Sequence, residues 1–199
     1  MKKYIALLSL LLFTTVAHAQ ALYICNQPDD ILSCGDGTND TVIAPDGMLS
    51  FVGTAGLTFG SMYVHEGAVN VDISAAGADT YVKVTGLTTG HLNNVTINSD
   101  AFNVGVIGHY KVDWQMSADS QGNNLTYEAD LFVNGVEEPD GSSRRKFGAA
   151  ADFGSMSGVA VIEVTNVAHD IDLRIKGVSN STDIDIFNMN FNIVQIGGR

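Results

Sequence analysis

The residues of this chain that could carry catalysis are scattered. The histidines at positions 65, 91, 109 and 169 form no HxH or HExxH pattern, and such a pattern is what places two imidazoles on one metal ion. The segment GSMSG (Gly154 to Gly158) lacks the GxSxG spacing of a nucleophile elbow. The 22 acidic residues could supply a carboxylate pair for glycoside hydrolysis, but no spacing singles out two of them. The sequence therefore predicts no enzyme, no catalytic residue and no cofactor.

Metal ligands are equally hard to single out. His65 and Glu66 are adjacent in the sequence, and neighbours on one strand point to opposite faces, so they are a poor pair of ligands for one ion. The segment GDGTND (Gly35 to Asp40) lacks the spacing and the closing Glu of an EF-hand calcium loop, so it is better interpreted as a turn. Aspartates on other loops also offer carboxylates to calcium. Whether a metal is bound is left open, and no metal-binding residue is predicted.

The first 19 residues have the three parts of a secretion signal. Met1 to Lys3 are positively charged, Tyr4 to Val16 are mostly apolar, and Ala17-His18-Ala19 has the small residues that signal peptidase recognises. We expect cleavage before Gln20; the alternative is an uncleaved segment in a protein that is not exported. No later segment approaches about 20 continuous apolar residues, so membrane insertion is not expected. The predicted location is secreted, periplasmic or at the cell surface.

Residues 20 to 47 form a polar N-terminal arm that holds both cysteines of the chain, Cys25 and Cys34. In an oxidising compartment we expect these two thiols to form a disulfide, which would stabilise the arm by about 2 to 3 kcal/mol through loop closure. Zinc would need more ligands than the arm offers, and lipidation would need a cysteine directly after the signal.

The excess of acidic residues argues against polyanionic partners. The chain has 10 basic and 22 acidic residues, and Lys2 and Lys3 belong to the predicted signal, which leaves 8 basic residues after cleavage. Such a surface repels nucleic acid and anionic lipid. The only basic cluster is Arg144-Arg145-Lys146. We interpret it as paired with Glu137, Glu138 and Asp140 of the same segment; a contact to an anion or a glycan is the alternative.

Strand patterns run through the rest of the chain, and GHYKVDWQMS (Gly108 to Ser117) is the clearest. Tyr110, Val112, Trp114 and Met116 alternate with polar residues, as in a half-buried strand. Val69, Val71 and Ile73 alternate in the same way. Asn134-Gly135 predicts a type I′ hairpin turn, and EEPDGSS (Glu137 to Ser143) after it predicts a loop. Between Asp183 and Ile196 the apolar residues change parity at Phe187, which indicates a bulge or burial on both faces.

These patterns predict an all-β fold. About ten strands with turns every eight to twelve residues, and no helix, indicate an antiparallel two-sheet sandwich over residues 48 to 199. A jelly roll is favoured over an immunoglobulin-like sandwich, because both cysteines precede the strands.

The order of elements resembles the globular head of the C1q and tumour necrosis factor superfamily. The resemblance rests on GHYKVDWQMS, a strand ending in LFVNG, a loop, then SGVAVIEV, DIDLRI and a closing apolar strand, and it covers roughly residues 50 to 197. Bacterial and phage versions of that head are the most similar. The resemblance implies a ten-strand jelly roll and a homotrimer with the last strand near its axis. The chain departs from the family in having His169-Asp170 where Gly-Asp is usual, and in lacking a collagen-like stalk.

Three functions are compatible with these observations. The first is an exported, non-enzymatic binding or structural module, a homotrimeric head that recognises a surface protein or glycan through its loops. The second is a phage virion component, such as a tail-fibre knob or decoration subunit, with the apparent signal retained. The third is a monomeric carbohydrate-binding β-sandwich. For the trimer, we expect one sheet to be apolar on both faces, with Phe187, Phe191 and the strand of Tyr110 and Trp114 as the candidates for carrying both core and interface. The expected contact loops are Asn98 to Asp100, Ser117 to Asn124 and Asn180 to Asp183.

Overall fold

The computed structural model describes residues 39–43, 49–53, 57–165 and 168–198. The chain divides into two units, Met1–Ala55 and Gly56–Arg199. In the first unit, β1 (Asn39–Ile43) pairs antiparallel with β2 (Leu49–Gly53). The predicted signal peptide and the predicted Cys25–Cys34 disulfide lie outside the described residues, and the predicted domain limits stay predictions.

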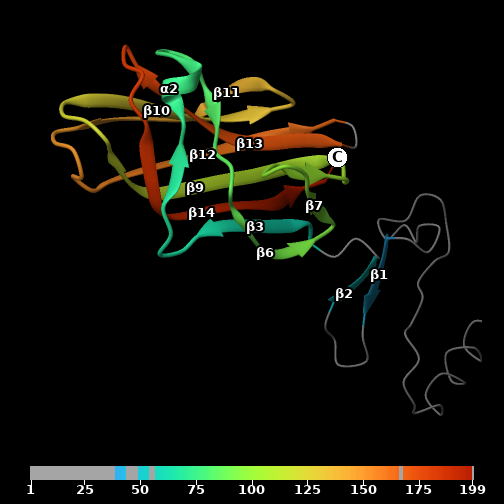
Figure 1. Cartoon of the computed structure of the whole chain (residues 1–199). Helices are drawn as coiled ribbons and strands as arrows, with labels where there is room; N and C mark the ends of the chain where they lie inside the picture. Colours follow the sequence, from blue (N-terminus) through green and yellow to red (C-terminus); the bar gives the residue numbers. More distant parts are fainter. Residues whose placement is uncertain (1–38, 44–48, 54–56, 166–167, 199) are drawn as a thin grey trace, which may run out of the picture. The chain divides into compact units, whose positions relative to one another are not determined.

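The second unit consists of two antiparallel six-stranded sheets. Sheet I has the order β12-β9-β14-β3-β6, with β4 paired to β14, and Figure 1 shows β9 and β14 side by side in it. Its strands are β12 (Gly154–Val164), β9 (Gly108–Ser120), β14 (Ile184–Gly197), β3 (Phe59–Val64), β6 (Thr88–Asn93) and β4 (Val69–Val71).

Sheet II has the order β11-β10-β13-β8-β7, with β5 paired to β13. Its strands are β11 (Val136–Phe147), β10 (Leu125–Val133), β13 (His169–Val178), β8 (Phe102–Val104), β7 (Val95–Ile97) and β5 (Val82–Lys83). After β8 the chain passes repeatedly between the sheets: β9, β12 and β14 belong to sheet I and β13 to sheet II, and the hairpin of β10 and β11 also belongs to sheet II. The predicted all-β, antiparallel two-sheet jelly-roll sandwich is confirmed, with more short strands than the ten expected.

The strand β9 has the predicted alternation. Tyr110, Val112, Trp114 and Met116 are all buried in the core, while His109, Lys111 and Gln115 are exposed. The Trp114 side chain also finds the polar partner that a buried indole needs, because its Nε1 donates to the carbonyl oxygen of Gly141 on β11 at 3.1 Å. This hydrogen bond of Trp114 therefore connects β9 of sheet I with the edge strand β11 of sheet II.

The parity change in the last strand is a β-bulge. The register of β14 against β9 shifts between Ile186 and Asn188, so that Phe187 is the extra residue. Phe191, beyond the bulge, is completely buried and its ring centroid lies 4.7 Å from that of Phe102 in sheet II. Tyr110, Trp114 and Phe191 are thus covered within one protomer. The expectation that this sheet is apolar on both faces is wrong, because the outer positions of β9 include His109, Lys111 and Gln115.

The hairpin between β10 and β11 has the predicted turn. Asn134 and Gly135 have φ values of 51° and 79°, and positive φ at both central positions is what a type I′ turn requires. The predicted loop at Glu137 to Ser143 is wrong, because these residues belong to β11. Their side chains are mostly exposed on an edge strand, so they lack the alternation that indicates a strand, and the register against β10 is irregular after Ala129.

A one-turn helix corrects another expectation. Ile73 does not continue the strand of Val69 and Val71; it begins α2 (Ile73–Ala76). Asp72 before it accepts a hydrogen bond from the backbone N–H of Ala75 at 2.9 Å, as a helix N-cap does. Among the residues that the structure describes, none belongs to a helix with the length and hydropathy needed to cross a membrane.

Candidate functional site

The structure places the candidate catalytic residues apart. His91, His109 and His169 belong to three different strands, and His65 and Glu66 follow β3 and are exposed. The GSMSG segment is part of β12, with both of its serines exposed on a regular strand and not at a strand-to-helix turn. Among the described residues, the one group of at least three His, Cys, Asp or Glu side chains that could share a metal ion contains no histidine.

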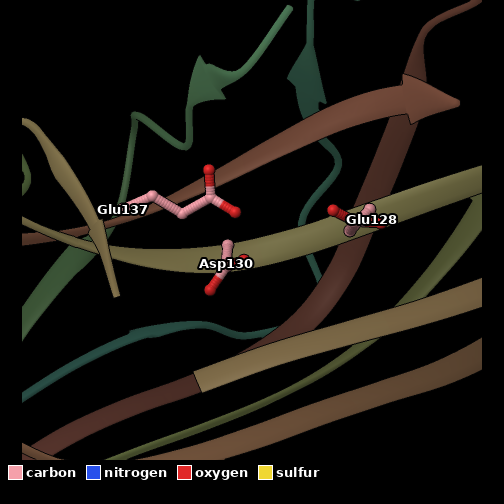
Figure 2. A group of neighbouring side chains, drawn as sticks. All are labelled: Glu128, Asp130 and Glu137. Carbon is pink, nitrogen blue, oxygen red and sulfur yellow. The ribbon is translucent and has the colours of Figure 1, made fainter. Parts of the chain in front are cut away.

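That group is Glu128, Asp130 and Glu137, which each have a carboxylate oxygen within 4.8 Å of the others. Glu128 and Asp130 lie two residues apart on β10 and so share its outer face, and Glu137 lies on the neighbouring β11 (Figure 2). The hydroxyl oxygen of Tyr81 lies 2.8 Å from Oε1 of Glu128 and 3.3 Å from carboxylate oxygens of both Asp130 and Glu137. Tyr81 therefore joins the three acids into one cluster.

Glu128 is already neutralised by cations of this chain. The Nζ of Lys176 lies 3.0 Å from its Oε1, and Arg144 forms an ion pair with its Oε2. Burial alone would raise the pKa of Glu128, but hydrogen bonds from Lys176, Tyr81 and Arg144 outweigh it and lower the pKa to about 2. Glu128 is thus ionised and paired at any physiological pH.

Asp130 has the opposite environment. It is almost completely buried, and its Oδ1 accepts a hydrogen bond from the backbone N–H of Leu131 at 3.0 Å. Burial, followed by the neighbouring Glu137, raises the pKa of Asp130 to about 6. The two carboxyl groups of β10 therefore differ in charge state between about pH 2 and pH 6, although they lie side by side.

The same face continues onto β13. Asp172 pairs with Arg174 at 2.7 Å and with Lys83 of β5 at 3.8 Å. Two of the cations also lie over aromatic rings, Arg174 over Phe132 at 4.2 Å and Lys176 over Tyr81 at 4.1 Å. We call these side chains the sheet II network: Tyr81, Lys83, Glu128, Asp130, Phe132, Glu137, Arg144, Asp172, Arg174 and Lys176. Four acids and four bases make it an internal ion network, not a vacant metal site.

The basic cluster at 144 to 146 does not behave as predicted. Arg144 pairs with Glu128 on β10, not with an acid of its own segment, and Arg145 donates to the carbonyl oxygen of Ser155 at 3.1 Å. The prediction failed because it treated the segment as a loop, whereas strand pairing places Arg144 opposite Glu128. The only sequence signal for the network is the outward parity of Glu128 and Asp130 in the LTYEADLFV strand.

The outer face of sheet I is built differently. Strand pairing aligns its residues in three rows across β12, β9, β14 and β3, namely Val161–Lys111–Val194–Phe59, Val159–Asp113–Asn192–Ser61 and Ser157–Gln115–Asn190–Tyr63. In these rows the charged residues are Lys111 and Asp113, which pair with each other at 3.1 Å. The rows are therefore neutral overall, in a chain whose formal net charge is −12.

A hollow on this face is lined partly by residues of the third row. Its polar lining consists of Gln115, Ser117, Ser155, Ser157, Asn188 and Asn190. Amide and hydroxyl groups of this kind can hydrogen-bond a neutral polar ligand or a second protein surface, but they supply neither a nucleophile with a base nor a set of metal ligands.

The predicted contact loops are largely confirmed as loops. Asn98 to Asp100 forms the turn between β7 and β8, and Asn180 to Asp183 connects β13 to β14. The third loop is shorter than predicted, since β9 continues to Ser120 and only Gln121 to Asn124 remain. The backbone N–H of Gln121 donates to the carbonyl oxygen of Asp183 at 3.3 Å, so two of the three loops are neighbours.

Comparison with known proteins finds likeness only at the level of structure. No protein-family model matches the chain, and no curated protein matches it either. Solved structures similar to it include Eiger TNF from S. frugiperda (12% identity, 71% of this chain, 95% of that chain, TM-score 0.48) and murine APRIL (11%, 71%, 100%, 0.46). The globular domain of the zebrafish complement 1qA protein is also similar (15%, 72%, 100%, 0.45). The likeness is to the fold alone.

Proposed function

We propose that this protein is an exported, non-enzymatic binding or structural module that assembles into a homotrimer and recognises a surface protein or glycan through its loops. Three copies is the number that the sequence resemblance implies, and export follows from the predicted signal at residues 1 to 19. The loops at Gln121 to Asn124 and Asn180 to Asp183 are the proposed contact surface, because neighbouring loops on a rigid sandwich can form one binding site.

The observation that carries the assembly is the set of three neutral rows on the outer face of sheet I. Copies of a chain with a formal net charge of −12 repel one another, and the three rows of this face are where two copies can meet without like charges in contact. Val159 and Val161 are 50% and 58% exposed there, so association would also remove apolar surface from water. We place the subunit interface on this face, which replaces the buried aromatic residues that the sequence had indicated.

The oligomeric state tests this proposal directly. Light scattering of the purified protein should give the mass of a trimer, and Val159→Arg should lower that mass to a monomer, because the substitution places a bulky cation in the second row. Val136→Arg is the matched control: Val136 is 70% exposed on β11 of sheet II, so this variant should remain trimeric.

A monomeric native protein would contradict the assembly and favour the carbohydrate-binding sandwich. Unchanged mass in Val159→Arg, with a trimeric native protein, would move the interface to another face. Repeating both measurements with calcium and then with a chelator shows whether a metal holds the subunits together.

A further inference from the structure

Two aspartates face each other near the Ser120 end of β9, and no basic side chain of the described residues forms an ion pair with either of them. Asp119 of β9 is paired in register with Asp185 of β14, and like charges directly opposite on neighbouring strands destabilise a sheet. Asp119 is only 9% exposed, and its Oδ1 is buried without a hydrogen-bond partner. Burial, and then the charge of Asp185, raises the pKa of Asp119. A buried carboxylate with no partner is costly and calls for an explanation.

The neighbouring side chains do not supply that missing partner. Asp185 accepts hydrogen bonds from Nδ2 of Asn70 at 2.9 Å and from Nε2 of Gln121 at 3.1 Å, so both of its oxygens are occupied by neutral donors. Within the described part of the chain, the ion pairs are formed by other residues and none reaches Asp119 or Asp185. The carboxylate pair therefore retains its negative charge toward the outside.

A partly exposed aromatic pair is formed by residues of the two strands that flank β9. The rings of Phe153 and Phe187 meet edge to face, with centroids 4.8 Å apart. Phe153 precedes β12 and Phe187 lies at the bulge of β14, and both strands flank β9, where Ala118 pairs with Gly154 and with Ile186. Phe153 is 57% exposed, and the register places Asp119 one residue beyond Ala118, which indicates that the two rings lie over the outer face of β9 near Asp119.

We propose that Asp119, Asp185, Phe153 and Phe187 form a binding site for a protonated organic cation, an ammonium or guanidinium group presented by a free amine or by a basic side chain of a partner protein. The carboxylates supply the charge, and the ring faces attract the cation through their quadrupoles. Calcium fits the site poorly, because it takes six to eight oxygen ligands and the amides of Asn70 and Gln121 turn their NH₂ groups toward Asp185.

This inference rests on the proposed binding function, for which it names the ligand chemistry, but it does not depend on the trimer. The site lies at the Ser120 end of β9, beyond the three neutral rows, and it borders the loop that begins at Gln121. A basic group held there would thus also be within the reach of the proposed contact loops.

Calorimetric titration of the full protein with n-butylammonium chloride tests the site, with sodium chloride at equal ionic strength as the reference. We expect saturable binding that Asp119→Asn weakens at least 10-fold. Phe153→Leu should weaken it about 2- to 5-fold, the range of an exposed cation–π contact. Asp152→Asn removes an exposed carboxylate from the same loop and should bind like the native protein. Capped lysine, Nα-acetyl-lysine methylamide, separates the two sources: tighter binding than butylammonium indicates a protein side chain, and equal binding a free amine.

The proposal is overturned if butylammonium shows no saturable binding, if calcium binds in its place, or if Asp119→Asn binds it as well as the native protein does. Light scattering of Asp119→Asn keeps this result apart from the proposed assembly. A trimer mass in both the native protein and Asp119→Asn, with amine binding lost in the variant, supports both proposals, whereas a trimer mass with unchanged amine binding rejects the cation site alone.

Discussion

The two outer faces of the sandwich treat charge in opposite ways. On sheet II, four acids and four bases are packed into one network in which Glu128, Asp130 and Asp172 are buried. On sheet I, the three rows across β12, β9, β14 and β3 hold one exposed ion pair among amides, hydroxyls and apolar side chains. The charges of sheet II are paired with one another within the protomer. The three rows of sheet I are neutral, and the carboxylate of Asp119 lies beyond them without a hydrogen-bond partner for its Oδ1.

This difference in charge pairing suggests different roles for the two faces: stability for sheet II, and association and binding for sheet I. A buried ion network contributes to stability only while every member is present, because each lost partner leaves a desolvated charge behind. An exposed face has no such requirement, since water satisfies whatever the protein does not. The sheet II network, though it contains the densest cluster of acids, is therefore expected to respond to substitution through stability, and sheet I through association and binding.

The largest effect is expected for Lys176→Met, which removes the cation 3.0 Å from Glu128. Both side chains are largely covered, with 19% and 12% exposed, so Glu128 would stay buried with only Arg144 and Tyr81 as partners. We expect the free energy of unfolding at pH 7 to fall by about 3 kcal/mol, at the lower end of the range for breaking a buried ion pair. Urea denaturation followed by Trp114 fluorescence measures it, and a loss below about 1 kcal/mol would show that the network is not a structural unit.

A smaller effect of opposite sign is expected for Asp130→Asn. The folded pKa of Asp130 is about 6, above its ordinary value of 3.8, so the folded state binds more protons than the unfolded state between about pH 4 and pH 6. The native protein therefore loses stability from Asp130 as the pH rises through that range. The Asn variant avoids this loss, and it should be about 2 kcal/mol more stable than the native protein at pH 7 and equally stable at pH 4.

Thermal melting of both proteins at half-unit steps from pH 4 to pH 7 measures this difference. Glu128 does not interfere, because its folded pKa of about 2 keeps it ionised in the folded protein over the whole range, and its own contribution is lost only as the pH falls from about 4.5 toward 2. A constant difference between native protein and variant across the range would mean that Asp130 does not titrate as its surroundings indicate.

The sequence predicted what local periodicity determines. The alternation in Gly108 to Ser117, the Asn134-Gly135 turn and the bulge at Phe187 each depend on residues within a few positions of one another, and all three were found. The sheet II network was missed because it needs contacts between distant segments: Tyr81 and Glu128 lie 47 residues apart. The strand at Glu137 to Ser143 was missed because an exposed edge strand carries no apolar alternation.

The same limit explains the error about the interface. From the sequence, Phe191 and Trp114 were apolar residues on two predicted strands, and nothing local tells a core aromatic from an interfacial one. Only the packing of sheet I on sheet II, with the ring of Phe191 against that of Phe102, shows that these side chains point inward. The neutrality of the outer rows likewise appears only once the register aligns Lys111 with Val161 and Val194.

The smallest effect is expected for Lys111→Met, the counterpart on sheet I of the Lys176 substitution. Lys111 lies 3.1 Å from Asp113, close to the 3.0 Å of the Lys176 pair, but its side chain is 48% exposed and that of Asp113 is 38% exposed. Water and Nδ2 of Asn192, 3.0 Å from Oδ2 of Asp113, can support the carboxylate after the lysine is gone. We expect the free energy of unfolding to change by less than about 0.5 kcal/mol, as for other exposed pairs.

The trimer should be weakened by Lys111→Met instead, because each subunit would then bring an uncompensated Asp113 to the proposed interface. A concentration series by light scattering at low and high salt measures that weakening, and salt should reverse it by screening the repulsion. A loss of stability equal to that of Lys176→Met, with unchanged assembly, would mean that the two faces do not differ in the way described.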